Sequence, residues 1–146
     1  AGEAEFADLP RDEGERRLDE GAALLARLGL PVAGFVAPAW QMARWVLPAL
    51  ASRGVRYAED HFRVYDPAGR SARASLVLNF ASRTPARLVS SALFVRAARP
   101  LRGIVPTRIA LHPGDMRSRV LRREVESVLR AARGTFTATS ADLVSV

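Results

Sequence analysis

Two short segments place residues able to meet a ligand directly after an apolar run. Residues 34–40 read Gly-Phe-Val-Ala-Pro-Ala-Trp, and this run ends in Pro38 and Trp40. Residues 108–115 read Arg-Ile-Ala-Leu-His-Pro-Gly-Asp, and the apolar part of this run ends in His112. In a sheet of parallel strands covered by helices, the residues just past the carboxyl ends of the strands form the ligand-binding face. If both runs are strands of one such sheet, Trp40 and His112 open onto a common cleft.

His112 is the first candidate for catalysis. Histidine side chains exchange protons near neutral pH, so an imidazole at the mouth of a sheet can protonate a leaving group. The alternative is a histidine that only forms a hydrogen bond to the next loop. Asp115 lies three residues later, just before a helical pattern, and its expected role is to cap that helix. The alternative role for Asp115 is to support His112 by orienting its ring.

Trp40 is the first candidate for ligand binding. A flat indole face is a good surface for sugar rings and other amphipathic ligands, although Trp40 could equally seal the rim of the core. Pro38 would fix the shape of the loop. The segment 59–61, Glu-Asp-His, could bind a metal, but adjacent residues of an extended chain point in opposite directions, so we expect a solvated loop. The chain has no Gly-rich phosphate loop, nucleophile elbow or HExxH spacing, and offers no convincing set of metal ligands.

The composition is that of an ordinary globular domain. The 146 residues are 49% hydrophobic and 25% charged, enough to bury a core. The absence of cysteine excludes disulfides and thiolate metal sites, and no apolar run approaches the roughly 20 residues of a membrane span. The net charge is +7, with Arg used throughout and no Lys. Because these arginines are scattered and not interleaved with aromatic residues, we expect no nucleic-acid partner.

The hydrophobic pattern alternates between helices and strands. The first expected elements are a helix capped by Asp8 or a neighbour and stopped by Gly29, a strand at 32–36, a helix at 42–53 kinked at Pro48 and stopped by Gly54, and a strand at 55–58. A hairpin at 62–75, a strand at 76–79, a helix opened by Thr84 and ending near 98, and a strand at 107–111 follow. The last expected elements are a helix at 116–133 stopped by Gly134, a strand at 135–137 and a short helix at 140–144. Such alternation predicts parallel strands with crossover helices. About five strands are fewer than the eight of a closed barrel, which leaves a small open sheet or the trailing part of a larger barrel.

Several of these segments occur in the same order in one known family. They are Glu5-Phe6-Ala7-Asp8-Leu9, Arg17-Leu18-x-x-Gly21, residues 34–40, Gly54-Val55-Arg56-Tyr57 and residues 110–115. On these residues the chain resembles the carboxyl-terminal portion of polysaccharide-deacetylase-like (NodB-homology) domains, in particular a poorly characterised bacterial branch. The resemblance runs from about Glu5 to Leu143. It implies an α/β fold, an incomplete (β/α) barrel with mostly parallel strands, crossover helices and one hairpin excursion, in which residues 1–146 form a single domain.

The resemblance also implies an activity, the removal of N-acetyl or related acyl groups from carbohydrate by hydrolysis of an amide bond. In the family a divalent metal, often zinc, is held by one Asp and two His. A second Asp acts as base, and a His late in the chain protonates the leaving amine. His112 matches that late His, while Pro38 and Trp40 fall in the motif that lines the substrate groove.

This sequence departs from the family pattern in ways that limit the expected activity. The family's base and metal ligands would lie before Ala1, so we expect the chain alone to bind no metal and to be inactive without a missing amino-terminal part. Val36 stands where the family commonly has an Arg, and Asp60 lies near an acidic motif whose Trp is missing, so Asp60 takes no role. The alternatives are a degenerate barrel that binds glycan without cleaving it, and a basic module for nucleic acid or anionic surfaces. An unpaired strand edge and uncovered apolar faces also predict self-association.

Overall fold

The chain forms two compact units, each with a sheet and a core of its own. The computed structural model describes residues 5–80, 85–98, 100, 104–112, 114–133 and 140–144. One unit comprises Ala1–Ala74 together with Ala138–Val146, and the other comprises Ser75–Thr137. Helices and parallel strand pairs confirm the mixed α/β class. The described residues form no closed barrel, so the barrel type stays a prediction.

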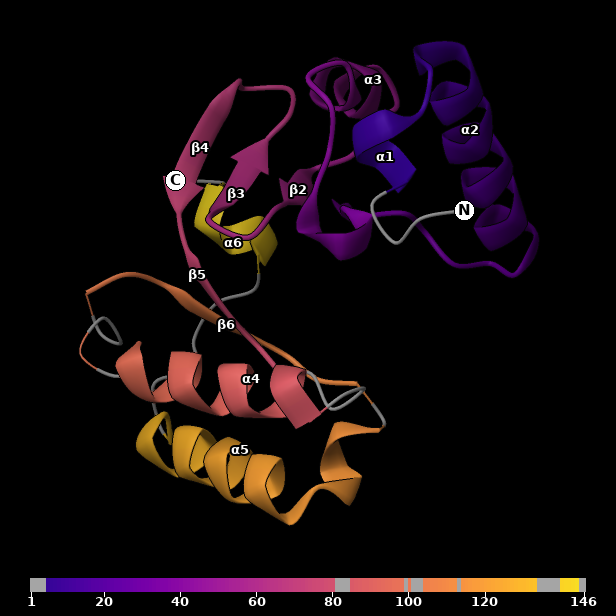
Figure 1. Ribbon diagram of the computed structural model, residues 1–146. Helices are drawn as coiled ribbons and strands as arrows, with labels where there is room; N and C mark the ends of the chain where they lie inside the picture. The colour runs from indigo at the N-terminus through magenta and orange to yellow at the C-terminus, as the bar shows by residue number, and fades with distance from the viewer. Residues whose placement is uncertain are drawn as a thin grey trace. The chain divides into compact units, whose positions relative to one another are not determined.

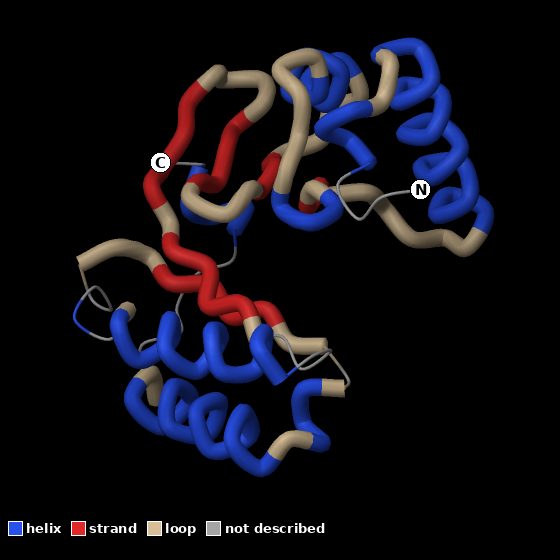
Figure 2. Tube along the Cα trace, in the orientation of Figure 1, coloured by secondary structure: helices blue, strands red, loops and turns tan. Residues whose placement is uncertain are grey.

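The first unit is built on a four-stranded sheet with the order β1-β2-β3-β4. Its strands are β1 (Gly34–Val36), β2 (Tyr57–Glu59), β3 (Arg63–Asp66) and β4 (Ser71–Ala74). The pair β1–β2 is parallel, whereas β2–β3 and β3–β4 are antiparallel. Figure 2 shows the strands of the chain in red and its helices in blue. Asp66 closes the turn between β3 and β4, because its carboxylate accepts hydrogen bonds from the amides of Ala68 and Gly69. The predicted hairpin excursion is confirmed.

The helices of the first unit are α1 (Glu5–Asp8), α2 (Arg11–Arg27), α3 (Val46–Ser52) and α6 (Ser140–Val144). Its core contains the buried side chains Phe6, Val46, Leu50, Val55 and Ala58. The carboxyl-terminal helix α6, confirmed at its predicted residues, contacts β2, β3 and β4. The end of the chain therefore belongs to the unit that its beginning forms.

The start of α2 differs from the sequence prediction. Asp8 is the last residue of α1, and α2 begins at Arg11 after Pro10, with no side-chain cap. The expectation that Asp8 caps the long helix is therefore wrong, because a proline at the junction ends one helix and opens the next. The predicted stop is confirmed: Gly29 follows α2 with a φ of 70°, which glycine adopts without strain.

The next helix is shorter than predicted. It starts at Val46 instead of Met42. Pro48 then lies in its first turn, where the missing amide hydrogen removes no helical hydrogen bond, so the reason to expect a kink disappears. Gly54 follows the helix with a φ of 68°, as a stop residue should.

The second unit is a two-stranded parallel sheet covered by two helices. The strands β5 (Leu76–Asn79) and β6 (Thr107–Ala110) pair in parallel along their whole length. The helix α4 (Pro85–Ala97) connects them and lies beside α5 (Arg119–Ala131) (Figure 1). Its core is formed by the buried side chains Leu78, Phe80, Ala92, Val95, Ala98, Leu121, Val125 and Val128. This strand–helix–strand unit is the crossover that the alternating pattern predicted.

Helix α5 departs in detail from its prediction. It begins at Arg119, after a 3-10 turn, η3 (Asp115–Arg117). Its buried apolar face consists of Leu121, Val125 and Val128, whereas Val120 and Leu129 are exposed. Glu124 is buried in that face instead, and its carboxylate is paired with Arg96 of α4 at 2.6 Å. A buried charge is tolerated when it is paired in this way.

Some predicted features lie outside the described residues. They are the Thr84 cap, the Gly134 stop and the strand at 135–137. Within the described ranges, no helix has the length and apolar composition that crossing a membrane requires.

Candidate functional site

His112 lies two residues beyond the end of β6, at the carboxyl edge of the parallel pair. Its Nδ1 atom is 3.1 Å from the carbonyl oxygen of Phe80, which follows β5, and 3.3 Å from Oδ2 of Asp115. A carbonyl oxygen can only accept a hydrogen bond, so these partners assign the hydrogen of a neutral ring to Nδ1. The second ring nitrogen, Nε2, is then free of a hydrogen. The side chain is 58% exposed, so a ligand can reach it.

Asp115 supports this arrangement from a buried position. It is only 1% exposed, and its Oδ2 accepts a hydrogen bond of 2.8 Å from the backbone amide of His112 in addition to its contact with the ring. Ser118, not Asp115, is the cap of α5, with its Oγ accepting from the amide of Leu121. The cap expected of Asp115 is therefore wrong, because η3 separates this residue from the helix. The carboxylate faces the histidine instead.

Trp40 ends a strained turn in the first unit. The 3-10 turn η1 (Pro38–Trp40) follows β1, and within it Ala39 and Trp40 have φ values of 50° and 60°. Left-handed backbone costs roughly 1–2 kcal/mol for a residue with a Cβ atom, and such strain clusters at functional sites. The indole ring stacks on His61, with ring centroids 5.8 Å apart and planes inclined by 28°.

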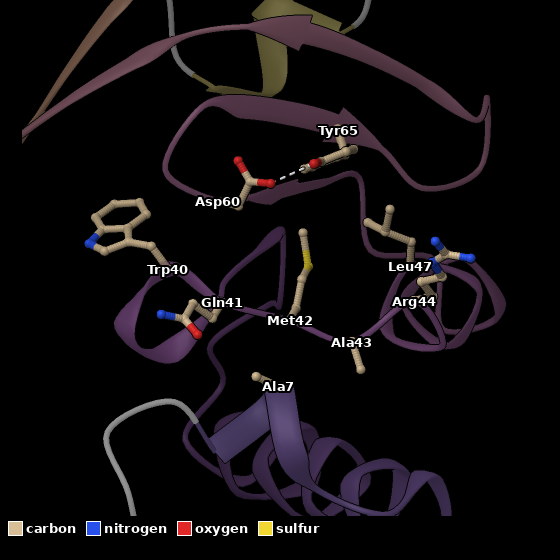
Figure 3. A pocket seen from close by; sticks show the side chains of 9 residues that line it. All are labelled: Ala7, Trp40, Gln41, Met42, Ala43, Arg44, Leu47, Asp60 and Tyr65. Atoms are coloured by element: carbon tan, nitrogen blue, oxygen red, sulfur yellow. Dashed lines mark hydrogen bonds between the residues drawn. The ribbon is translucent and has the colours of Figure 1, made fainter.

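A pocket of about 420 Å³ opens beside this tryptophan. Its volume is within the range of small-molecule sites. It is lined by Ala7, Trp40, Gln41, Met42, Ala43, Arg44, Leu47, Asp60 and Tyr65. Figure 3 shows Trp40 and Arg44 at opposite ends, with Met42 between them. Pro38 is not among the lining residues of this pocket and lies in the turn that carries Trp40, so its contact with substrate stays a prediction.

Asp60 and Tyr65 form a hydrogen-bonded pair in the wall of the pocket (Figure 3). The Tyr65 hydroxyl donates to Oδ2 of Asp60 at 2.5 Å, while Oδ1 accepts from the amides of Phe62 and Arg63, each at 2.8 Å. Burial, together with the hydrogen bond to this carboxylate, raises the pKa of Tyr65 to about 12. The phenol therefore remains a hydrogen-bond donor at neutral pH. Spacing along the sequence predicts a role for neither residue.

The segment 59–61 is not the solvated loop that we expected. Glu59 ends β2 and is 7% exposed, and the next two residues make the contacts just described. Among the residues that the structure describes, no group of three His, Cys, Asp or Glu side chains could hold a metal ion.

The two candidate sites belong to different units. Trp40 lies in the first and His112 in the second, so their sharing one cleft stays a prediction. Comparison of the chain with protein-family models, with curated proteins and with solved structures found no match. The geometry of each site therefore carries the functional proposal.

Proposed function

We propose that the chain is the carboxyl-terminal part of a carbohydrate deacetylase-like hydrolase, whose metal-binding part lies outside it. In this role His112 transfers a proton to the amine that leaves the sugar, and Trp40 forms part of the sugar-binding wall. The observation that carries the proposal is the ring of His112, which is held through Nδ1 by two acceptors and exposed to solvent.

The held ring suits general acid chemistry. With Nδ1 directed at Phe80 and Asp115, a proton taken up by the neutral ring goes to Nε2. From Nε2 it can pass to the nitrogen of a scissile amide as the carbon–nitrogen bond breaks. Asp115 is a positioning residue, since its carboxylate touches the imidazole and not the substrate. Its burial prevents it from swinging away.

The test is substitution of His112 in a parent chain that includes the amino-terminal part. His112→Ala is expected to lower turnover by roughly two to four powers of ten and to leave metal content unchanged. His61→Ala is the matched control, because His61 is the second of the two histidines and contacts Trp40. That control is expected to change KM more than kcat. Unchanged turnover in the His112 variant would remove this residue from the mechanism.

A second candidate function is glycan binding without cleavage. The pocket at Trp40 favours it, because its aromatic and polar lining lies within one unit and needs no metal. Trp45→Phe leaves Trp40 as the sole tryptophan, so quenching of its fluorescence by N-acetylglucosamine oligomers reports on the pocket directly. Binding measured by calorimetry that Trp40→Ala abolishes, in a parent chain without hydrolytic activity, supports this function over the first.

A further inference from the structure

One arginine that lines the pocket beside Trp40 has no ion-pair partner among the described residues. This residue, Arg44, is exposed, and within the described part of the chain its guanidinium makes no hydrogen bond or ion pair. Some arginines of this unit are paired, since Arg53 contacts Asp19 and Arg17 contacts Glu5. The Arg44 charge is thus available to a ligand.

The carboxylate of the pocket is engaged elsewhere and is not paired with Arg44. Asp60 is held by its own loop through three donors, the amides of Phe62 and Arg63 and the hydroxyl of Tyr65. The oxygen atoms of this carboxylate are therefore already engaged, whereas the guanidinium of Arg44 is not. A ligand that enters the pocket meets a cation that is free to pair with an anion.

We infer that this pocket takes an acidic sugar, with one sugar ring on the face of Trp40 and a carboxylate on Arg44. The inference rests on the proposed carbohydrate function and adds the class of sugar. An indole binds the apolar face of a sugar ring, and a guanidinium binds a carboxylate through two parallel hydrogen bonds. Since Trp40 and Arg44 stand at opposite ends of the pocket, ring and carboxylate belong to different parts of one oligosaccharide (Figure 3). The net charge of +7 would further favour the approach of an anion.

Two tetrasaccharides of equal length test the inference. One is the neutral oligomer of N-acetylglucosamine, and the other alternates N-acetylglucosamine with glucuronate. Binding of each is followed by tryptophan fluorescence and by calorimetry at low and at moderate salt. The acidic oligomer is expected to bind roughly tenfold more tightly, with an advantage that shrinks as salt rises.

Two substitutions test whether the higher affinity for the acidic oligomer comes from Arg44. Arg44→Gln is expected to remove roughly tenfold of the affinity for the acidic oligomer and to leave the neutral oligomer unaffected. Arg27→Gln, at the exposed end of α2, removes the same charge away from the pocket and should change neither affinity. Equal affinities for both oligomers, or equal losses in the two arginine variants, overturn the acidic-sugar inference and leave glycan binding intact. If Trp40→Ala leaves the affinity for both oligomers unchanged, the acidic-sugar inference and the glycan-binding role are overturned together.

Discussion

At the scale of single residues, the turn that carries Trp40 stores strain next to the pocket. Ala39 is exposed and has a left-handed φ of 50°. Ala39→Gly is expected to raise the free energy of unfolding by roughly 0.5–1 kcal/mol, because glycine removes the steric cost and no contact is lost. Urea denaturation measures the change. Ala68 lies in the turn between β3 and β4 and its φ is not left-handed, so Ala68→Gly should lower the free energy of unfolding. A lower free energy of unfolding in both variants would contradict strain at Ala39.

Tyr65, in the wall of the pocket, should make the stability of the fold depend on pH in the alkaline range. Its pKa is raised from 10.0 to about 12, so the folded state holds the phenolic proton more firmly than the unfolded state does. The stabilisation is fully present below pH 10 and is lost as pH rises through about 12. The free energy of unfolding should therefore fall more steeply between pH 10 and pH 12 in the natural chain than in Tyr65→Phe. Tyr57, the other tyrosine, is common to both proteins and cancels in the comparison.

The sequence indicated His112 and, as one of two alternatives, its contact with Asp115, but not the pairing of Asp60 with Tyr65. His112 stands out by its type and its place after an apolar run. The contact of Tyr65 with Asp60 depends on the antiparallel pairing of β2 with β3, which folds the chain back directly after Glu59. Local spacing does not report that reversal. The left-handed backbone at Trp40 has no signal either, because glycine, the usual marker, is absent from residues 37–41.

At the scale of elements, close packing distinguishes two glycines of α2. A Cβ atom at Gly14 would lie 2.1 Å from Cη2 of Trp45, whereas at Gly21 it would meet nothing within 4 Å. Gly14→Ala is expected to cost about 1–3 kcal/mol by overpacking, and Gly21→Ala to gain about 0.5–1 kcal/mol of helix propensity. Thermal unfolding of the two variants measures both effects. Stabilisation by both substitutions would mean that Trp45 does not pack against this helix.

Elements bounded by strong local signals were predicted well, and those bounded by tertiary contacts were not. The strand at 76–79, the hairpin and the helix at 140–144 are confirmed at or near their predicted residues. The start of α3 was wrong by four residues, since residues 42–45 are apolar enough to continue a helical pattern but form a turn instead. For α5, the sequence could not show that Glu124 would be buried, because the Arg96 side chain that pairs with it comes from α4.

At the scale of the whole molecule, the division into two units is the feature that no local pattern reveals. The unit of Ser75–Thr137 is inserted between parts of the first unit, so that the last helix returns to a sheet formed some 70 residues earlier, between 57 and 74. Chain length and alternating elements suggested a single sheet. Which strands pair is decided by long-range packing, and hydrophobic periodicity carries no information on it.

Removing residues 138–146 should therefore destabilise the beginning of the chain. Helix α6 contacts β2, β3 and β4 through a face that includes the buried Ala141. Its loss uncovers part of that sheet and is expected to cost the first unit roughly 1–3 kcal/mol. Both tryptophans, Trp40 and Trp45, lie in that unit, so their fluorescence follows its unfolding selectively.

A core substitution in the other unit provides the comparison for this truncation. Leu121→Ala removes a fully buried side chain of the second unit and should destabilise that unit by about 2–5 kcal/mol. Far-ultraviolet circular dichroism, which detects helices of both units, should record this loss. If the units unfold separately, the tryptophan transition stays in place in Leu121→Ala and shifts to lower denaturant in the truncated chain. If the truncation leaves the midpoint of the tryptophan transition unchanged, α6 does not stabilise the first unit.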